Sequence, residues 1–279
     1  MIWNFGKIYR EIRKAKHISQ SKICSHELSR STLSKIENCK LIPSFEIMNY
    51  LLNQINVSFE EFIYLCNGYH STNRDILCQQ VYKQLRSNNV HKLNTLVENC
   101  ESFLNQNTDL YVYIMTQFLK IKSDLCRRNI DKPNINIALA VYHHLEKCDN
   151  WYWNDFILCD IILFDLPFES VKQITTRLLH SLSKYDNYHT TDPLRCRLLI
   201  NLSTIYLYHY DYKTCILILT KCLKYINILK RYDYIAIYHI RMGICQKSKS
   251  QINTGVSMLQ QFDDKYTLSN MKDEVMRFY

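Results

Sequence analysis

The residues that could ligate a metal or act as nucleophiles are scattered along this sequence. Its twelve cysteines include no Cys-x-x-Cys pair, and the two closest, Cys215 and Cys222, are seven residues apart. His143 and His144 are adjacent, so on a helix their side chains diverge and cannot share a metal with Glu146. No glycine-rich phosphate loop, nucleophile elbow or catalytic carboxylate pair occurs. We therefore predict no enzyme activity, no metal and no cofactor, and reduced cysteine thiols in a cytoplasmic protein.

Serines near the N-terminus have another chemical role, because they can cap short helices. Ser19, Ser29, Ser44 and Ser58 each precede a segment of apolar periodicity. Glu61 follows Ser58 by three residues, which is the pattern of a capping box. These signals divide the segment 1–66 into five short helices with short connections between them. This pattern is typical of a compact bundle in which the second and third helices form a helix-turn-helix pair.

Apolar spacing and charge describe the same segment further. The residues predicted to face its core are Phe5, Ile8, Tyr9, Ile12, Ile23, Leu33, Ile36, Ile47, Leu51, Leu52 and Ile55. Residues 1–42 hold nine Lys and Arg against three Glu, a net charge of +6, within a whole-chain net charge of +9. Residues 43–69 hold three Glu and neither Lys nor Arg. A basic excess on the helix-turn-helix side indicates contact with a polyanion.

Two segments carry a family resemblance: Gly6–Lys14 (GKIYREIRK) and Arg30–Asn38 (RSTLSKIEN). They resemble the XRE-type helix-turn-helix and, more narrowly, Rgg/MutR regulators, which are peptide-responsive transcription factors of low-GC Gram-positive bacteria. The resemblance implies that the third helix enters the major groove of DNA. The DNA-contacting residues it implies are Gln20, Ser29, Arg30, Ser31, Ser34 and Lys35. Arg30 has the side chain best suited to bind guanine O6 and N7 together. The alternative for these residues is the solvated polar face of an ordinary bundle.

Other charged residues of the head have a structural interpretation. The resemblance implies that Arg10 and Glu37 form an ion pair that ties the first helix to the third. Arg13, Lys14 and Lys16 are expected to be exposed and to attract phosphates without specificity.

The head departs from the family pattern at two turns. His17 and Cys39 stand where the family usually has Gly, at sites where a positive φ is easy for Gly. The backbone of these turns is therefore expected to differ in shape from that of the family, while the helices around them match.

The rest of the chain reads as helices alone. Residues 67–73 are polar and contain Gly68, so we predict a linker there between a head at residues 1–66 and a body at residues 74–279. The body is predicted to contain ten or eleven helices of three to five turns each, which favours a solenoid of stacked hairpins. A faint internal repeat aligns Thr204 with Gly243 and Asp211 with Ser250. The predicted breaks are 131–133, 165–167, 190–193, 210–211 and 247–251.

The resemblance extends to this body, because Rgg-like proteins carry degenerate tetratricopeptide-like repeats. Residues 150–155 (NWYWND) resemble a recurrent aromatic patch of that body. On the inner wall of such a stack we expect Asn201, Ile205, Tyr208, Ile240 and Ile244. An amide among aliphatic residues suits a short apolar peptide in extended form. The alternative is that these residues pack between neighbouring helices.

Together these features predict an all-α protein: a five-helix DNA-binding head and an α-solenoid of degenerate tetratricopeptide-like pairs. The predicted function is a homodimeric transcription regulator, by resemblance an activator of the quorum-sensing type. It would bind a near-palindromic operator in double-stranded DNA and respond to a short apolar peptide. We expect no membrane contact, since the longest apolar run, 156–164, has nine residues and contains Asp160. Two alternatives stay open: a DNA-binding regulator whose body is a protein-docking scaffold, and an enzyme with a helical body.

Overall fold

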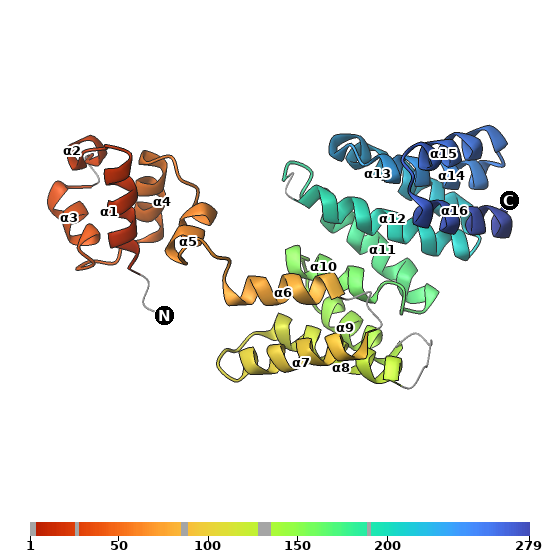
Figure 1. Cartoon of the computed structure of the whole chain (residues 1–279), viewed down its shortest axis with the longest axis horizontal. Coiled ribbons are helices and arrows are strands. Elements are labelled where there is room, and N and C mark those ends of the chain that lie inside the picture. Colours follow the sequence, from red (N-terminus) through yellow and green to blue (C-terminus); the bar gives the residue numbers. More distant parts are fainter. Residues whose placement is uncertain (1–3, 26–27, 85–88, 128–134, 189–190) are drawn as a thin grey trace. The chain divides into compact units, whose positions relative to one another are not determined.

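The computed structural model describes the whole chain except residues 1–3, 26–27, 85–88, 128–134 and 189–190. All regular structure in the described part is helical. The helices are α1 Phe5–Ala15, α2 Gln20–Ile23, α3 Arg30–Glu37, α4 Phe45–Gln54, α5 Phe59–Cys66, α6 Asn73–Gln84, α7 Val90–Leu104, α8 Leu110–Arg127, α9 Ile135–Glu146, α10 Trp153–Ile162, α11 Phe168–Ser183, α12 Asp192–Tyr208, α13 Tyr212–Leu229, α14 Tyr232–Gln246, α15 Lys249–Gln261 and α16 Lys265–Phe278 (Figure 1). None of these described helices is both long enough and apolar enough to cross a bilayer.

The chain divides into two compact units, residues 1–84 and 85–279. The predicted linker, residues 67–73, is mainly the connection between α5 and α6. The division between the two units comes after α6, which therefore belongs to the first unit. We call the first unit the head and the second unit the body.

Serine caps begin four of the five short helices of the head, as predicted. Ser19, Ser29, Ser44 and Ser58 each accept a hydrogen bond from a backbone N–H three residues later, at 3.3, 3.1, 3.3 and 3.0 Å. These bonds satisfy amides that the first helical turn leaves without a partner. The helix boundaries of the head are thus set by local chemistry.

Helices α1 to α5 of the head, drawn in red to orange in Figure 1, share an apolar core. Its fully buried members are Tyr9, Ile23, Leu28, Leu33, Ile36, Met48, Leu51, Leu52, Ile55, Val57 and Phe62. The predicted inward residues Phe5, Ile8, Ile12 and Ile47 pack at its edge and are partly buried. The helical spacing therefore predicted the buried face of α2, α3 and α4, whereas in α1 it identified Tyr9 and residues beside the buried stripe.

The two turns that lack Gly keep the positive φ that Gly would favour. His17 has φ 55° and Cys39 has φ 57°. The backbone at these two turns, which we expected to differ from the family pattern, therefore has a conformation that Gly adopts readily. This conformation costs free energy at His17 and Cys39, because positive φ is unfavourable for residues with a Cβ.

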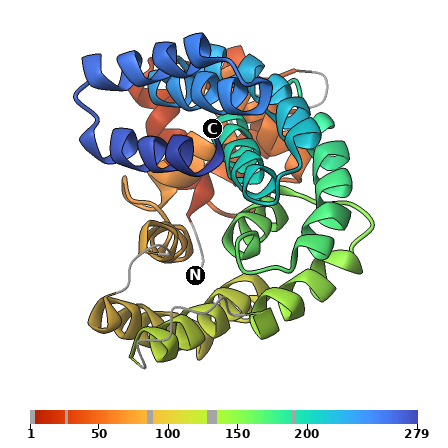
Figure 2. The ribbon, with the colours of Figure 1, turned by 90° about the vertical axis from the view of Figure 1, so that its right-hand side faces the viewer.

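The body consists of ten described helices that pack on one another in chain order, as Figure 2 shows from yellow-green to blue. Two hairpins are well defined: α12 with α13, and α14 with α15. Their turns contain Tyr210 and Lys247 with φ 59° and 55°, and their second helices are capped by Asp211 and Ser248. Asp211 thus corresponds to Ser248, and the predicted alignment of Asp211 with Ser250 was wrong by two positions. The predicted breaks at 165–167 and 210–211 are confirmed. The break predicted at 247–251 is shorter, because α15 begins at Lys249, and the one predicted at 190–193 ends where α12 begins at Asp192. Residues 131–133 and 190 lie outside the described part of the chain.

Packing within the body separates the helices into two rows. Helices α10, α12, α14 and α16 contact one another in succession, and we call them the even-numbered row. Helices α11, α13 and α15 pack mainly on members of that row. In a curved stack the helices of the inner side approach each other most closely, so the even-numbered row forms the inner side of the curve.

Candidate nucleic-acid interface and peptide site

The helix-turn-helix pair consists of α2 and α3, which pack on each other, and α3 also packs on α1. Helix α3 buries Leu33, Ile36 and Glu37, so its remaining residues face outward. Arg30 stands at its first position and is exposed, without a hydrogen bond or ion pair to any described residue. Its guanidinium is therefore available to a ligand.

The side chains of the other predicted DNA contacts, near Arg30, differ in exposure and in hydrogen bonding. Ser31 and Lys35 are exposed, and Ser34 is half-buried. The Ser29 hydroxyl caps α3 and lies 2.8 Å from the hydroxyl of Ser31. These residues lie at or within two turns of the N-terminus of α3, where the amides of a helix favour phosphate.

The side chain of Gln20 is held by a hydrogen bond to the buried Glu37. Its Nε2 donates to Glu37 Oε2 at 2.8 Å, and the side chain is half-buried. The bond fixes the start of α2 relative to the end of α3. Gln20 therefore links the two helices of the pair, and its contact with a phosphate stays a prediction.

Helix α1 is tied to α3 by an ion pair of Arg13. The predicted Arg10–Glu37 pair was wrong, and so was the expectation that Arg13 is exposed. Arg13 Nε and Nη2 donate to the two carboxylate oxygens of Glu37 at 2.6 and 2.9 Å, and both side chains are buried. The hydrogen bond to Glu37 raises the pKa of Arg13. Arg10 instead donates to Asn38 Oδ1 at 3.1 Å.

Helical geometry explains this correction. Gly6, Tyr9 and Arg13 are spaced by three and four residues, so they form the buried stripe of α1. Arg10 follows Tyr9 directly and points about 100° away from it. A Cβ on Gly6 would lie 1.8 Å from the Ile36 carbonyl oxygen, so α1 and α3 approach each other closely there. This close contact places Arg13, one turn beyond Tyr9, against Glu37.

Lys16 also differs from its prediction. Its side chain is exposed, but its Nζ donates to the carbonyl oxygens of Ile55 and Asn56 at 2.6 and 3.2 Å. These carbonyls lie at the end of α4, where a cation is favourable. Lys16 thus connects the end of α1 to the end of α4.

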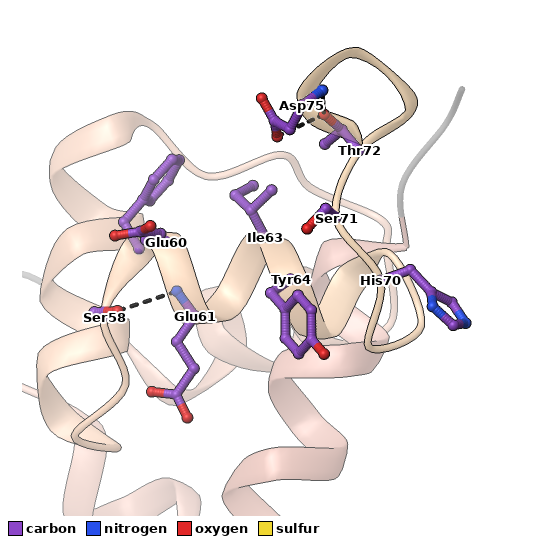
Figure 3. A pocket seen from close by; sticks show the side chains of 10 residues that line it. Ser58, Glu60, Glu61, Ile63, Tyr64, His70, Ser71, Thr72 and Asp75 are labelled. Atoms are coloured by element: carbon purple, nitrogen blue, oxygen red, sulfur yellow. Dashed lines mark hydrogen bonds between the residues drawn. The ribbon is translucent and has the colours of Figure 1, made fainter. Parts of the chain in front are cut away.

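The opposite charge gathers around α5 and the segment that follows it. A cavity of about 770 Å³ there is lined by Ser58, Phe59, Glu60, Glu61, Ile63, Tyr64, His70, Ser71, Thr72 and Asp75 (Figure 3). Thr72 Oγ1 donates to Asp75 Oδ2 at 2.6 Å, which orders the entry into α6. Three carboxylates and no Lys or Arg line this surface. Its negative charge is unfavourable for an anion such as phosphate.

In the body, polar contacts join neighbouring helices of the even-numbered row. Asn201 Nδ2 on α12 donates to Asp160 Oδ1 on α10 at 2.8 Å. Arg197, one turn before Asn201, forms an ion pair with the other oxygen of Asp160 at 3.0 Å. The predicted amide therefore lies in the inner row but is buried, at 7% exposure, whereas Arg197 beside it is partly exposed.

A second contact of this kind, between α14 and α16, was missed by the sequence analysis. Arg241 donates to both carboxylate oxygens of Glu274 at 2.9 and 2.8 Å, and both residues are buried. The same guanidinium reaches α12, where it donates to Ser203 Oγ at 2.8 Å and to the Ile200 carbonyl at 3.0 Å. A lone Arg in the apolar run IAIYHIRMGIC was the available signal. Its partner lies far along the chain, on another helix, and left no local signal.

The aliphatic residues predicted for the inner wall are mostly buried. Ile205 is 8%, Ile240 0% and Ile244 2% exposed. A Cβ on Gly255 would lie 2.7 Å from Ile240 Cγ1, so Ile240 faces α15 and not the inner side. That expectation for Ile240 is corrected, because the hairpin contact between α14 and α15 uses its side of the helix. Ile244, three residues from Arg241, lies near the inner side but is covered.

Tyr208 is the accessible member of the predicted set, at 40% exposure. Its ring lies 4.9 Å from the ring of Phe278 and 4.9 Å from the Arg277 guanidinium, both on α16. Of the five predicted residues, Asn201, Ile205 and Tyr208 thus lie along one helix of the row. Among the described residues no cluster of three metal-ligating side chains occurs.

Several known structures have a similar arrangement of helices. No protein-family model matches the chain. A protein from Listeria monocytogenes EGD-e described as a transcriptional regulator has a TM-score of 0.79 and 17% identity, over 99% of this chain and 97% of that chain. A cysteine-to-serine variant of the Streptococcus dysgalactiae SHP pheromone receptor Rgg2 has a TM-score of 0.76 and 17% identity, over 99% of this chain and 100% of that chain.

A third similar structure contains ligands. ComR from S. thermophilus, in complex with DNA and its signalling peptide ComS, has a TM-score of 0.62 and 13% identity, over 98% of this chain and 99% of that chain. These likenesses extend over nearly the full length of each protein. The chain therefore has the Rgg-type fold, a helix-turn-helix head followed by a helical-repeat body.

Proposed function

We propose that this protein is a transcription regulator whose head binds duplex DNA through α3. The observation that carries the proposal is the setting of Arg30: it is exposed and without a partner among the described residues, at the start of a helix fixed by the Ser29 cap and the Arg13–Glu37 pair. A rigid helix with a free guanidinium suits bidentate binding of guanine. The complex of ComR with DNA supports the same use of this fold.

We further propose that the body binds a short apolar peptide against the even-numbered row, near Asn201, Ile205 and Tyr208. The amide oxygen of Asn201 could accept a peptide N–H while its nitrogen remains bound to Asp160. Ile240 and Ile244 would then support the row from within. The ComR complex, which contains a signalling peptide, supports a peptide site in this fold.

A homodimer with two heads would bind a near-palindromic operator. Half-sites one helical turn apart, or a multiple of it, follow from the two-fold symmetry of such a dimer. The peptide would act by favouring one arrangement of the helix rows, since a ligand shifts only states that it binds differently. Activation of transcription, in the manner of quorum sensing, is the output we propose.

The DNA proposal is tested by Arg30→Ala in the full chain. We expect operator affinity to fall by about 1–3 kcal/mol and discrimination at one base pair to weaken, measured by fluorescence anisotropy with a panel of single-base variants. Lys265→Ala, an exposed lysine on α16, is the control and should leave binding unchanged. Unaltered affinity of Arg30→Ala would remove Arg30 from the interface.

The peptide proposal is tested by Asn201→Ala. Binding of short apolar peptides encoded beside the operator should weaken by about 1–3 kcal/mol, while the peptide-free protein keeps its DNA affinity. Thr220→Ala on α13, which removes only a bond within its own helix, is the matched control. Loss of folding in Asn201→Ala would assign this residue a structural role. Normal DNA binding without any peptide binding would favour a protein-docking body.

A further inference from the structure

Aromatic side chains are exposed on the side of the head that α5 forms. Phe59, the first residue of α5, is 47% exposed, and Tyr64 on the same helix is 45% exposed. Phe45, the first residue of α4, is 69% exposed, and its ring centroid lies 5.8 Å from that of Phe59. Neighbouring aromatic rings that stay exposed are typical of surfaces that bind another protein.

The rings of α5 border the cavity of about 770 Å³ described above. Phe59, Ile63 and Tyr64 supply its apolar lining from α5, and Ser71 and Thr72 line it from the segment before α6 (Figure 3). In protein interfaces, apolar anchor residues of one partner commonly fill cavities of the other. We call the following six lining residues the α5 surface: Phe59, Glu60, Glu61, Ile63, Tyr64 and Asp75.

The charge around these rings is negative. Glu60, Glu61 and Asp75 line the cavity, and all three are exposed, as is Glu46 on α4. Glu60 and Glu61 form no ion pair with another described residue, so no neighbouring cation neutralises them. Arg74 precedes Asp75 in the chain, but it is half-buried and does not line the cavity. The surface therefore combines accessible aromatic rings with an excess of carboxylates.

The α5 surface lies away from the proposed DNA-binding helix. Helix α1 packs on both α3 and α5, and these two helices lie on different sides of it (Figure 1). Duplex DNA bound at α3 therefore does not have to cover the α5 surface. The carboxylates also disfavour a nucleic acid as its occupant, since phosphate carries the same sign of charge.

We propose that the α5 surface docks a positively charged segment of another protein, one that carries Lys or Arg beside apolar side chains. The apolar side chains would fill the cavity against Phe59 and Tyr64, and the cations would face Glu60, Glu61 and Asp75. Opposite charges of this kind direct the encounter and select the partner, whereas the aromatic contacts supply most of the binding energy. This function adds to DNA binding through α3 and does not depend on it.

The test uses the full chain and, as the probe, a synthetic amphipathic helical peptide made of Lys and Leu. We expect binding that weakens as salt rises, with hydrogen exchange slowed in α5 and residues 67–75 more than elsewhere. Two peptides of the same length, one all Lys and one with Glu in place of each Lys, should bind about tenfold more weakly or less, because each lacks one half of the complementarity.

Two results with the probe would overturn the proposal. One is the absence of binding at low salt, where the attraction between charges is greatest. The other is slowed exchange in α12 and α14 without any change in α5, which would place the probe on the even-numbered row of the body.

Variants of exposed residues test the same surface. Glu60→Gln/Glu61→Gln should weaken binding of the Lys–Leu peptide by about five- to tenfold, and Tyr64→Ser should also weaken it. Glu11→Gln/Glu98→Gln makes the same change in net charge at two exposed glutamates outside the α5 surface, so it is the matched control and should bind normally. Equal loss in both double variants would reduce the effect to net charge and contradict the proposal.

The state of the peptide-free variants completes the test. A thermal melt checks that each one is folded, and if Tyr64→Ser is not, the two double variants decide alone. Sedimentation velocity measures the oligomeric state, which we expect to be the same in Glu60→Gln/Glu61→Gln as in the wild type. A change of that state would assign the surface to a contact between two copies of this chain and would also overturn the proposal.

Discussion

In the described part of each unit, one buried Arg–Glu pair is bidentate, and the two pairs hold helices together in different ways. In the head, Arg13 and Glu37 join α1 to α3, beside a core that all five short helices share. In the body, Arg241 and Glu274 join α14 to α16, and the same Arg also binds α12. The head pair supports one fixed bundle. The body pair, through the further bonds of Arg241, connects three successive members of the even-numbered row.

The difference shows how each unit could serve its proposed function. A helix that binds base edges has to be held in one position, and in the head the Arg13–Glu37 pair, Gln20 and the close contact at Gly6 all fix α3. A stack that responds to a ligand needs a few contacts whose change is felt over several helices. Arg241 has that position, because it binds groups on α12 and α16 from α14.

The largest effect is expected from Glu274→Ala. Removing this carboxylate leaves the Arg241 charge buried between three helices, at a cost of about 3–5 kcal/mol to the stability of the body. Hydrogen exchange should show faster exchange in α12, α14 and α16 and unchanged protection in the head. If protection fell equally in both units, the two would not be separate in stability, and the comparison would fail.

A smaller loss, about 3 kcal/mol, is expected from Glu37→Ala. Arg13 keeps its hydrogen bond to the Ile18 carbonyl and lies at the end of α1, so part of its charge can reach water. Proteolysis or hydrogen exchange should detect loosening of α1 and α3 alone. The double variant Arg13→Met/Glu37→Leu is the control, and it should recover most of the lost stability because no charge is left unpaired. A stable Glu37→Ala with a weakened body would reverse our assignment of the pairs.

The smallest effect should be a gain in stability at the turns of the head. His17→Gly and Cys39→Gly each remove a Cβ from a backbone with positive φ, so we expect each to raise the free energy of unfolding by up to about 1 kcal/mol. Chemical denaturation measures this. Lys40→Gly, next to Cys39 but without a positive φ, is the matched control and should not stabilise. Destabilisation by both glycine variants would show that these side chains contribute more than their backbone costs.

For the head, the helix starts and most core positions could be predicted from the sequence, but the contact between α1 and α3 could not. Caps and apolar spacing are local properties, so Ser29 and Leu33 could be assigned from the sequence alone. The choice between Arg10 and Arg13 depends on which side of α1 contacts α3, and that follows from the closeness of Gly6 to Ile36. The family resemblance therefore assigned the ion pair to Arg10, three positions before the arginine that forms it.

In the body, local signals were weaker guides. The helices and most of their breaks followed from periodicity, but Ile240 was placed on the wrong side because α14 is apolar on nearly all faces. Arg241 and Glu274 lie on different helices with α15 between them in the chain, so no spacing rule connects them. Asp160 and Asn201, on α10 and α12, are even further apart along the chain, so their contact could not be foreseen for the same reason.

The most direct test of the central claim is selection of duplex DNA by the purified full chain from a library of fragments of its own genome, at low salt. Our account predicts enrichment of a near-palindromic sequence whose binding by Arg30→Ala is weaker and less selective. Failure of the wild-type chain to retain any fragment, even in dilute salt where phosphate attraction is greatest, would contradict it.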